Sequence, residues 1–148
     1  MIRQAAILSI IVILSGCAAV VPSVSSGSSE SSFLEPGEIP RRVTIQSDGI
    51  SNYDPVGEIL AVELRSLGFI VVEDNPDGIF IGKVQYSDFS PVHLELTLIN
   101  KKTGRVQWSA AIVRKYDMYA SVVSASESNA RKAIELLGRD LSKVGFRR

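Results

Sequence analysis

The stretch Leu94-Glu-Leu-Thr-Leu-Ile-Asn-Lys-Lys-Thr-Gly-Arg-Val-Gln-Trp108 contains the clearest structural pattern in the chain. Apolar and polar residues alternate before its centre, which predicts a strand over residues 92–100 that buries Val92, Leu94, Leu96 and Leu98. Lys101 to Gly104 then form a turn in which glycine supplies a positive φ angle. The chain returns as a strand over residues 105–115 that buries Val106, Trp108, Ala110 and Ile112. The stretch therefore predicts an antiparallel hairpin.

Three more strands and a helix are expected before this hairpin. The strands cover residues 42–46, 69–73 and 79–86, each rich in β-branched or aromatic residues. The helix begins at Asp54-Pro55, with Asp54 as its cap and Pro55 in its first turn, where a missing N–H costs nothing. An apolar stripe at spacings of three and four follows and ends before Gly68: Val56, Ile59, Leu60, Leu64 and Leu67.

A second amphipathic helix is expected at the end of the chain. Ser124-Ala-Ser-Glu127 has the spacing of a capping box, and an apolar stripe runs from Ala130 to Val144 before Gly145. The element order is then β-α-β-β-β-β-α. This order predicts an α+β fold: a four- to five-stranded, mostly antiparallel sheet with two helices packed on one face. Residues 42–148 form a single domain of ordinary size.

The amino terminus has the features of an export signal. Arg3 is followed by an apolar run from Ala5 to Leu14, and then by Leu14-Ser15-Gly16-Cys17. These residues resemble the bacterial lipoprotein signal. The resemblance implies that residues 1–16 are a cleaved signal peptide and that Cys17 receives acyl chains, which anchor the protein in a membrane. The alternative is an uncleaved anchor over 5–21, near the lower length limit for a membrane span.

Ala18 and Ala19 follow the cysteine, where an Asp commonly retains relatives at the inner membrane, so the expected location is the outer membrane, facing the periplasm. Residues 17–41 are rich in serine and contain three prolines, which predicts a flexible linker. Two alternatives remain for Phe33-Leu34 in this linker. They dock on a partner, or they cover an edge of the domain's own core.

Composition excludes several functional classes. The formal net charge is +0, and without Arg3 there are 15 basic against 16 acidic residues, so no field attracts nucleic acid. Cys17 is the only cysteine and His93 the only histidine. A cysteine or histidine triad and a multi-histidine metal site therefore lack partners. We expect no catalytic, metal-binding or cofactor-binding residue, and no enzymatic activity. His93 is assigned to the outer face of its strand.

The loop over residues 73–78 is a candidate calcium site. Residues 73–78 place oxygen ligands at alternate positions before a glycine, as a calcium loop does, but Val84 stands where such a loop needs a Glu. A turn between strands is the preferred interpretation.

Residues 116–123 hold Tyr116, Met118 and Tyr119, a composition favoured at interfaces. They are candidates for partner contact, and a strand continuation packed on the domain explains them equally well.

The domain as a whole resembles a group of small periplasmic domains. The Leu67-Gly68-Phe69 helix end, the strand from Gly78 to Val84, and the hairpin from Leu94 to Trp108 are similar to those of the curli secretion lipoprotein, the lipoprotein activator of penicillin-binding proteins, the Pel export lipoprotein and the amino-terminal domain of the Tol translocation protein. The resemblance implies a lipid-anchored binding module that regulates or assists an envelope machine, through a protein partner or its own copies. The alternative is a ligand-carrying lipoprotein of the lipopolysaccharide-assembly type.

Overall fold

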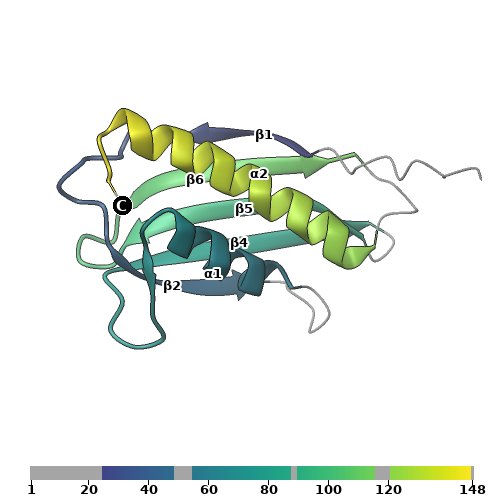
Figure 1. Cartoon of the computed structure of the whole chain (residues 1–148), viewed down its shortest axis with the longest axis horizontal. Helices are drawn as coiled ribbons and strands as arrows, with labels where there is room; N and C mark the ends of the chain where they lie inside the picture. Colours follow the sequence, from purple (N-terminus) through teal and green to yellow (C-terminus); the bar gives the residue numbers. More distant parts are fainter. Residues whose placement is uncertain (1–24, 49–54, 88–89, 116–120, 148) are drawn as a thin grey trace, which may run out of the picture.

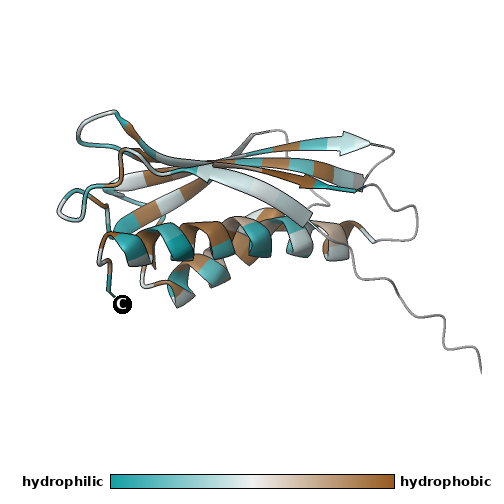
Figure 2. Cartoon of the chain, turned by 90° about the horizontal axis from the view of Figure 1, so that it is seen from above, coloured by the Kyte–Doolittle hydropathy of each residue, from teal (hydrophilic) through white to brown (hydrophobic). Residues whose placement is uncertain are grey.

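The computed structural model describes residues 25–48, 55–87, 90–115 and 121–147, which form a sheet covered on one face by two helices (Figure 1). Figure 2 shows both helices on the same side of the sheet. The elements in chain order are β1 (Ser25–Glu30), β2 (Arg42–Asp48), α1 (Val56–Ser66), β3 (Ile70–Val71), β4 (Gly78–Ser87), β5 (Ser90–Asn100), β6 (Val106–Arg114) and α2 (Val122–Lys143). The predicted α+β class is confirmed.

The sheet is six-stranded and mixed, in the order β1-β6-β5-β4-β2-β3. The pairs β4/β5, β5/β6 and β1/β6 are antiparallel, while β2 is parallel to both β3 and β4. The predicted count of four to five strands was therefore wrong. The predicted element order β-α-β-β-β-β-α was also wrong, because a further strand, β1, comes before β2. The parallel pairs follow from α1, because a crossover helix returns the chain in the same direction.

The extra strand is β1, which lies within the predicted linker of residues 17–41. Its six residues pair antiparallel with β6, from Ser25 opposite Arg114 to Glu30 opposite Ser109. Farther along the same segment, Leu34 and Ile39 are only 6% and 8% exposed and belong to the core. The prediction of a flexible linker was thus wrong from Ser25 onward, because backbone pairing holds β1, which has no apolar side chains, and Leu34 and Ile39 pack into the core after it.

The predicted β5/β6 hairpin is confirmed, with two changes at its ends. Gly104 has a φ of 69°, as the turn requires. Val106 was expected in the core but is 45% exposed, because a register shift between Leu98 and Ile99 turns it outward. At the other end of β5, the pairing of β5 with β4 has a second register shift, between Gln85 and Tyr86 of β4. A β-bulge changes which face a side chain occupies, so alternation alone misplaces residues beyond it.

Both helices end in the same way. After α1, the Phe69 N–H donates to the Leu64 carbonyl at 3.1 Å around Gly68, whose φ is 98°. After α2, the Phe146 N–H donates to the Leu141 carbonyl at 3.1 Å around a second positive-φ glycine. These are Schellman motifs. They bring Phe69 and Phe146 together, with ring centroids 5.1 Å apart, so the two helix ends share one aromatic cluster.

The helix starts differ from expectation. The N-cap of α2 is Ser121, whose Oγ accepts from the Ser124 N–H at 3.1 Å, so the helix begins one turn before the predicted cap at Ser124. Serine occupies both positions, and the spacing alone did not distinguish them. The cap predicted at Asp54 lies outside the described residues; the structure places Pro55 at the N-cap of α1.

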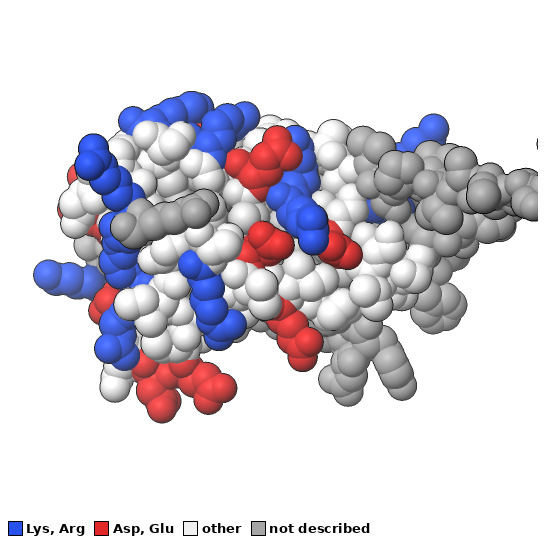
Figure 3. Space-filling view, in the orientation of Figure 1, with Lys and Arg blue, Asp and Glu red and all other residues white. Residues whose placement is uncertain are grey.

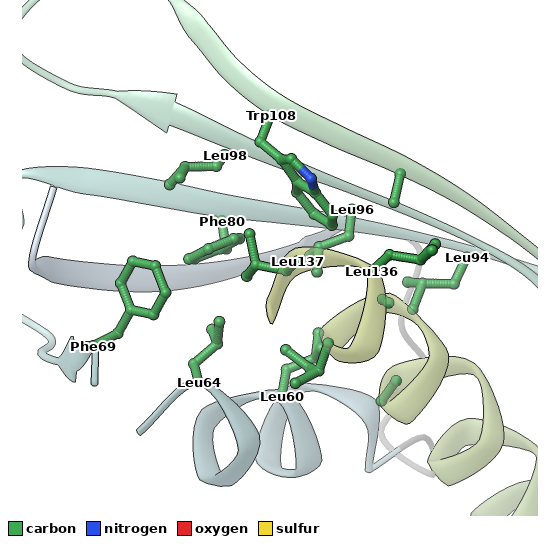
Figure 4. Packing of buried hydrophobic residues seen from close by; sticks show 14 of the residues in the cluster. Leu60, Leu64, Phe69, Phe80, Leu94, Leu96, Leu98, Trp108, Leu136 and Leu137 are labelled. Carbon is green, nitrogen blue, oxygen red and sulfur yellow. The ribbon is translucent and has the colours of Figure 1, made fainter. Parts of the chain in front are cut away.

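The core lies between the sheet and the helices (Figure 4). Leu60 and Leu64 of α1 and Leu137 of α2 are fully buried against the inner face of the sheet. The inner-face side chains shown are Phe80, Leu94, Leu96, Leu98 and Trp108. Within the described ranges, neither helix is long and apolar enough to cross a membrane.

Candidate functional site

The predicted functional residues fall outside the part of the chain that the structure describes. This holds for the lipidation residue Cys17 and for the contact candidates Tyr116, Met118 and Tyr119. The site is therefore built from the described residues that adjoin them. Residue 25 begins β1 eight positions after Cys17, and residues 115 and 121 flank the contact candidates.

The residues considered for metal or histidine chemistry lie in a turn and on a strand of the sheet. Residues 73–78 form the connection into β4, with Asn75 at a φ of 48°. His93 Nε2 lies 3.4 Å from Glu95 Oε1 on the outer face of β5. Among the described residues, no three His, Cys, Asp or Glu side chains are placed to hold a metal ion.

A set of side-chain hydrogen bonds in the described residues docks β1 onto α2. Alternate residues of β1 face the helix layer, and two of them, Ser25 and Ser29, end in hydroxyls that reach α2. Between them lies Gly27, where an added Cβ would be 2.5 Å from Ile112 Cδ1 and 2.6 Å from the Ala111 carbonyl oxygen. Glycine is therefore required there for the strand to approach β6.

The first docking point is at the start of β1. Ser25 Oγ donates to Asn129 Oδ1 at 2.9 Å and lies 2.7 Å from Ser128 Oγ. Asn129 is only 1% exposed, and its Nδ2 donates to the Pro91 carbonyl at 3.4 Å. Arg114 Nε donates to the same carbonyl at 3.1 Å. The first residue of β1 is thus joined to α2, β5 and β6 at once.

The second docking point is Asp140, whose side chain is 1% exposed. Its Oδ2 accepts from Ser29 Oγ at 2.5 Å and from Trp108 Nε1 at 3.0 Å. Its Oδ1 lies 3.2 Å from both Arg139 Nε and Lys143 Nζ. Burial by itself raises the pKa of this carboxyl, but the four hydrogen bonds outweigh it and lower the pKa to about 2.

The two docking residues of α2 match the spacing of their partners on β1. Asn129 and Asp140 are eleven positions apart, which is close to three helical turns, so they lie on one face about 16 Å apart. Ser25 and Ser29 are four positions apart, so they share a face of the strand and lie about 13 Å apart. The two elements therefore meet in one alignment, and this set of contacts fixes where the chain enters the domain.

The rest of the described surface is mixed in charge. Along α2 the signs alternate, with Arg131 2.7 Å from Glu127 and Lys132 2.9 Å from Glu135 (Figure 3). Such pairs are typical of a solvated helix face and contribute little stability. The large apolar side chains that remain exposed in the described residues are spread over several parts of the domain: Phe33, Val62, Ile70, Val106, Val113 and Val123. Leu34 covers the core while Phe33 is 65% exposed, so the core-covering alternative holds for Leu34 alone.

The alternative of a ligand-carrying lipoprotein requires an apolar cavity in the domain. One of about 960 Å³ lies between the segments 37–41, 75–77 and 100–103 and is open to solvent. Its walls include Arg41, Asp77 and Lys101, and it meets the core at Ile39. Between helices and sheet, side chains such as Leu60, Leu94 and Leu137 are fully buried and packed together. The described residues thus give no support to an apolar ligand site inside the domain.

Comparison with known proteins gives a likeness of fold. No protein family and no curated protein matches the chain. A single-residue variant of PelC from Paraburkholderia phytofirmans, a dodecamer, is similar at a TM-score of 0.57 and 18% identity over 78% of this chain and 98% of that one. A second PelC dodecamer from that organism has a TM-score of 0.55 at 18% identity, over 76% and 97% of the two chains. The chain therefore has the fold of these PelC subunits.

Proposed function

We propose that this protein is a non-enzymatic, lipid-anchored binding module that serves as an accessory subunit of a cell-envelope export machine. The observation that carries the proposal is the docking of β1 on α2, at Asn129 and Asp140. This strand begins eight residues after Cys17. The domain is thereby built to be held by its amino-terminal end. The likeness of fold to PelC over 78% of this chain and 98% of that one supports the export role implied by the resemblance to the Pel export lipoprotein.

The proposed working form is an assembly of several copies. The solved PelC proteins are dodecamers. In this chain the sheet ends on one side at β1 and on the other at β3. No described strand pairs with the outer edge of either. Two different edges on opposite sides allow a head-to-tail contact, the kind of contact that closes into rings.

The anchor can be tested at Cys17. In a bacterial host given labelled palmitate, we expect the full chain to incorporate label and to fractionate with membranes. Cys17→Ala is expected to lose the label, because no other thiol exists. Ser26→Ala, a change at an exposed serine, is the matched control and should behave as the parent. Labelling of the Cys17→Ala chain would contradict the proposal.

The assembly can be tested by native mass spectrometry of the lipidated chain in detergent. We expect an integral multiple of the single-chain mass, with many copies per particle. The mass should hold on dilution into the micromolar range, since obligate interfaces are large. A single-chain mass at every concentration would contradict assembly and leave a monomeric adaptor as the role.

A further inference from the structure

We propose that the domain rests on the membrane through the end at which β1 begins, with Val113 and Val123 against the lipid surface. This inference rests on the proposed acylation of Cys17 and adds an orientation to it. Three features support it: the fixed position of Ser25, the small number of residues between Cys17 and Ser25, and the side chains around Ser25.

The position of Ser25 is fixed by several independent contacts. Its backbone pairs with Arg114 at the end of β6, and its hydroxyl binds Asn129 and Ser128 of α2. Asn129 is 1% exposed. The tether therefore enters the domain at one defined point, beside the end of β6 and the first half of α2 (Figure 1).

The tether is short relative to the domain. Residues 18–24 separate Cys17 from Ser25, so the chain reaches about 26–29 Å when fully extended. For comparison, a random coil of the same length spans roughly 15 Å. In contrast, β5 has 11 residues, which corresponds to about 37 Å. With Ser25 held this close, the domain cannot stand on the opposite end, where the β5/β6 turn lies.

The side chains at the two ends differ in the way a lipid surface requires. Near the tether, Val113 is 52% exposed on β6, paired with Ser26, and Val123 is 56% exposed in the first turn of α2. Lys115, two residues after Val113, is also exposed. The β5/β6 turn instead holds Lys101, Lys102 and Thr103, all exposed. Figure 3 shows Lys and Arg side chains gathered at that far end.

The experiment uses the full lipidated chain in vesicles of phosphatidylethanolamine and phosphatidylglycerol. Single cysteines replace Val113, Val123 or Lys102, and each carries an environment-sensitive fluorophore; the acylated Cys17 cannot react with the dye. All three positions are exposed, so the variants should fold, which circular dichroism checks. With quencher-labelled lipid, we expect a strong loss of fluorescence and a blue shift at 113 and 123. We expect no loss at 102.

Flotation with the vesicles separates the two proposals. A chain that floats but is quenched at 102 as strongly as at 113 and 123 overturns the orientation and leaves the anchor standing. A chain that floats with no quenching at any position does the same, since the domain then stands off the surface. A chain that stays at the bottom of the gradient overturns the anchor, and the orientation with it.

Discussion

Asp140→Ala is expected to lower the free energy of unfolding by about 3 kcal/mol at neutral pH. The carboxylate accepts hydrogen bonds from Ser29 of β1 and from the Trp108 indole of β6. Removing it leaves the Trp108 N–H buried without its acceptor and opens a small space beside α2. Trp108 is the only tryptophan, so urea unfolding followed by its fluorescence measures the change directly.

The matched control for this prediction is Glu135→Ala on the same helix. Glu135 also pairs with a lysine, but its side chain is 67% exposed, so its loss should cost less than about 1 kcal/mol. The comparison separates the removal of a buried acceptor from the loss of negative charge on α2. Equal costs for the two variants would show that the Asp140 contacts do not stabilise the domain.

The same carboxyl predicts a pH dependence. Its pKa is lowered from 3.8 to about 2 in the folded protein. A lowered pKa contributes stability above the unfolded value of 3.8, and this contribution is lost as the pH falls toward 2. The amount is about 2 kcal/mol. The stability difference between the parent chain and Asp140→Asn should therefore shrink by this amount between pH 6 and pH 2, and an unchanged difference would contradict the prediction.

The elements that could be predicted are those that bury apolar side chains. Burial on one face imposes a period of two on β5 and of about 3.6 on α1 and α2, and both periods are visible in the sequence. The strand β1 has no such period, because Ser25 to Glu30 contribute backbone hydrogen bonds and hydroxyls instead of apolar surface. A serine-rich strand and a serine-rich coil have the same composition.

The docking residues left a weaker signal. Asn129 and Asp140 occupy positions within the buried stripe of α2, next to Ala130 and Leu141. A polar residue inside such a stripe needs a buried partner, and this could have been recognised from the sequence. The identity of that partner could not be predicted, because Ser25 and Ser29 are more than a hundred positions away in the sequence. Cys17 remains a prediction from its local motif.

Gly27→Val is expected to detach β1 from the sheet without unfolding the rest of the domain. The new side chain would collide with the Ile112 side chain and the Ala111 carbonyl. The end of the Ile112 side chain can turn aside, but the carbonyl belongs to the backbone that pairs with β1 and cannot yield without breaking that pairing. Overpacking of this kind costs about 2 kcal/mol. The cost cannot exceed the docking free energy of β1, because an edge strand can detach and relieve the collision.

Hydrogen exchange distinguishes detachment from global unfolding. We expect faster exchange along β1 and along the edge of β6 that faces it, with unchanged exchange in β4 and β5. Ser28→Val is the matched control: Ser28 is exposed on the opposite face of the same strand, so valine meets open surface there. Unchanged exchange along β6 in Gly27→Val would show that the strand accommodates a side chain at this position.

Detachment should also change the behaviour of the protein at a membrane. With β1 docked, the tether ends at Ser25; with β1 released, the next described core residue along the chain is Leu34. The free segment after Cys17 then roughly doubles, and its full reach rises to about 60 Å. That reach exceeds the length of the domain, so either end can meet the lipid. In Gly27→Val, quenching of labels at 113 and 123 should therefore fall while flotation persists. Quenching that stays at the parent level would mean that the docked strand does not orient the domain.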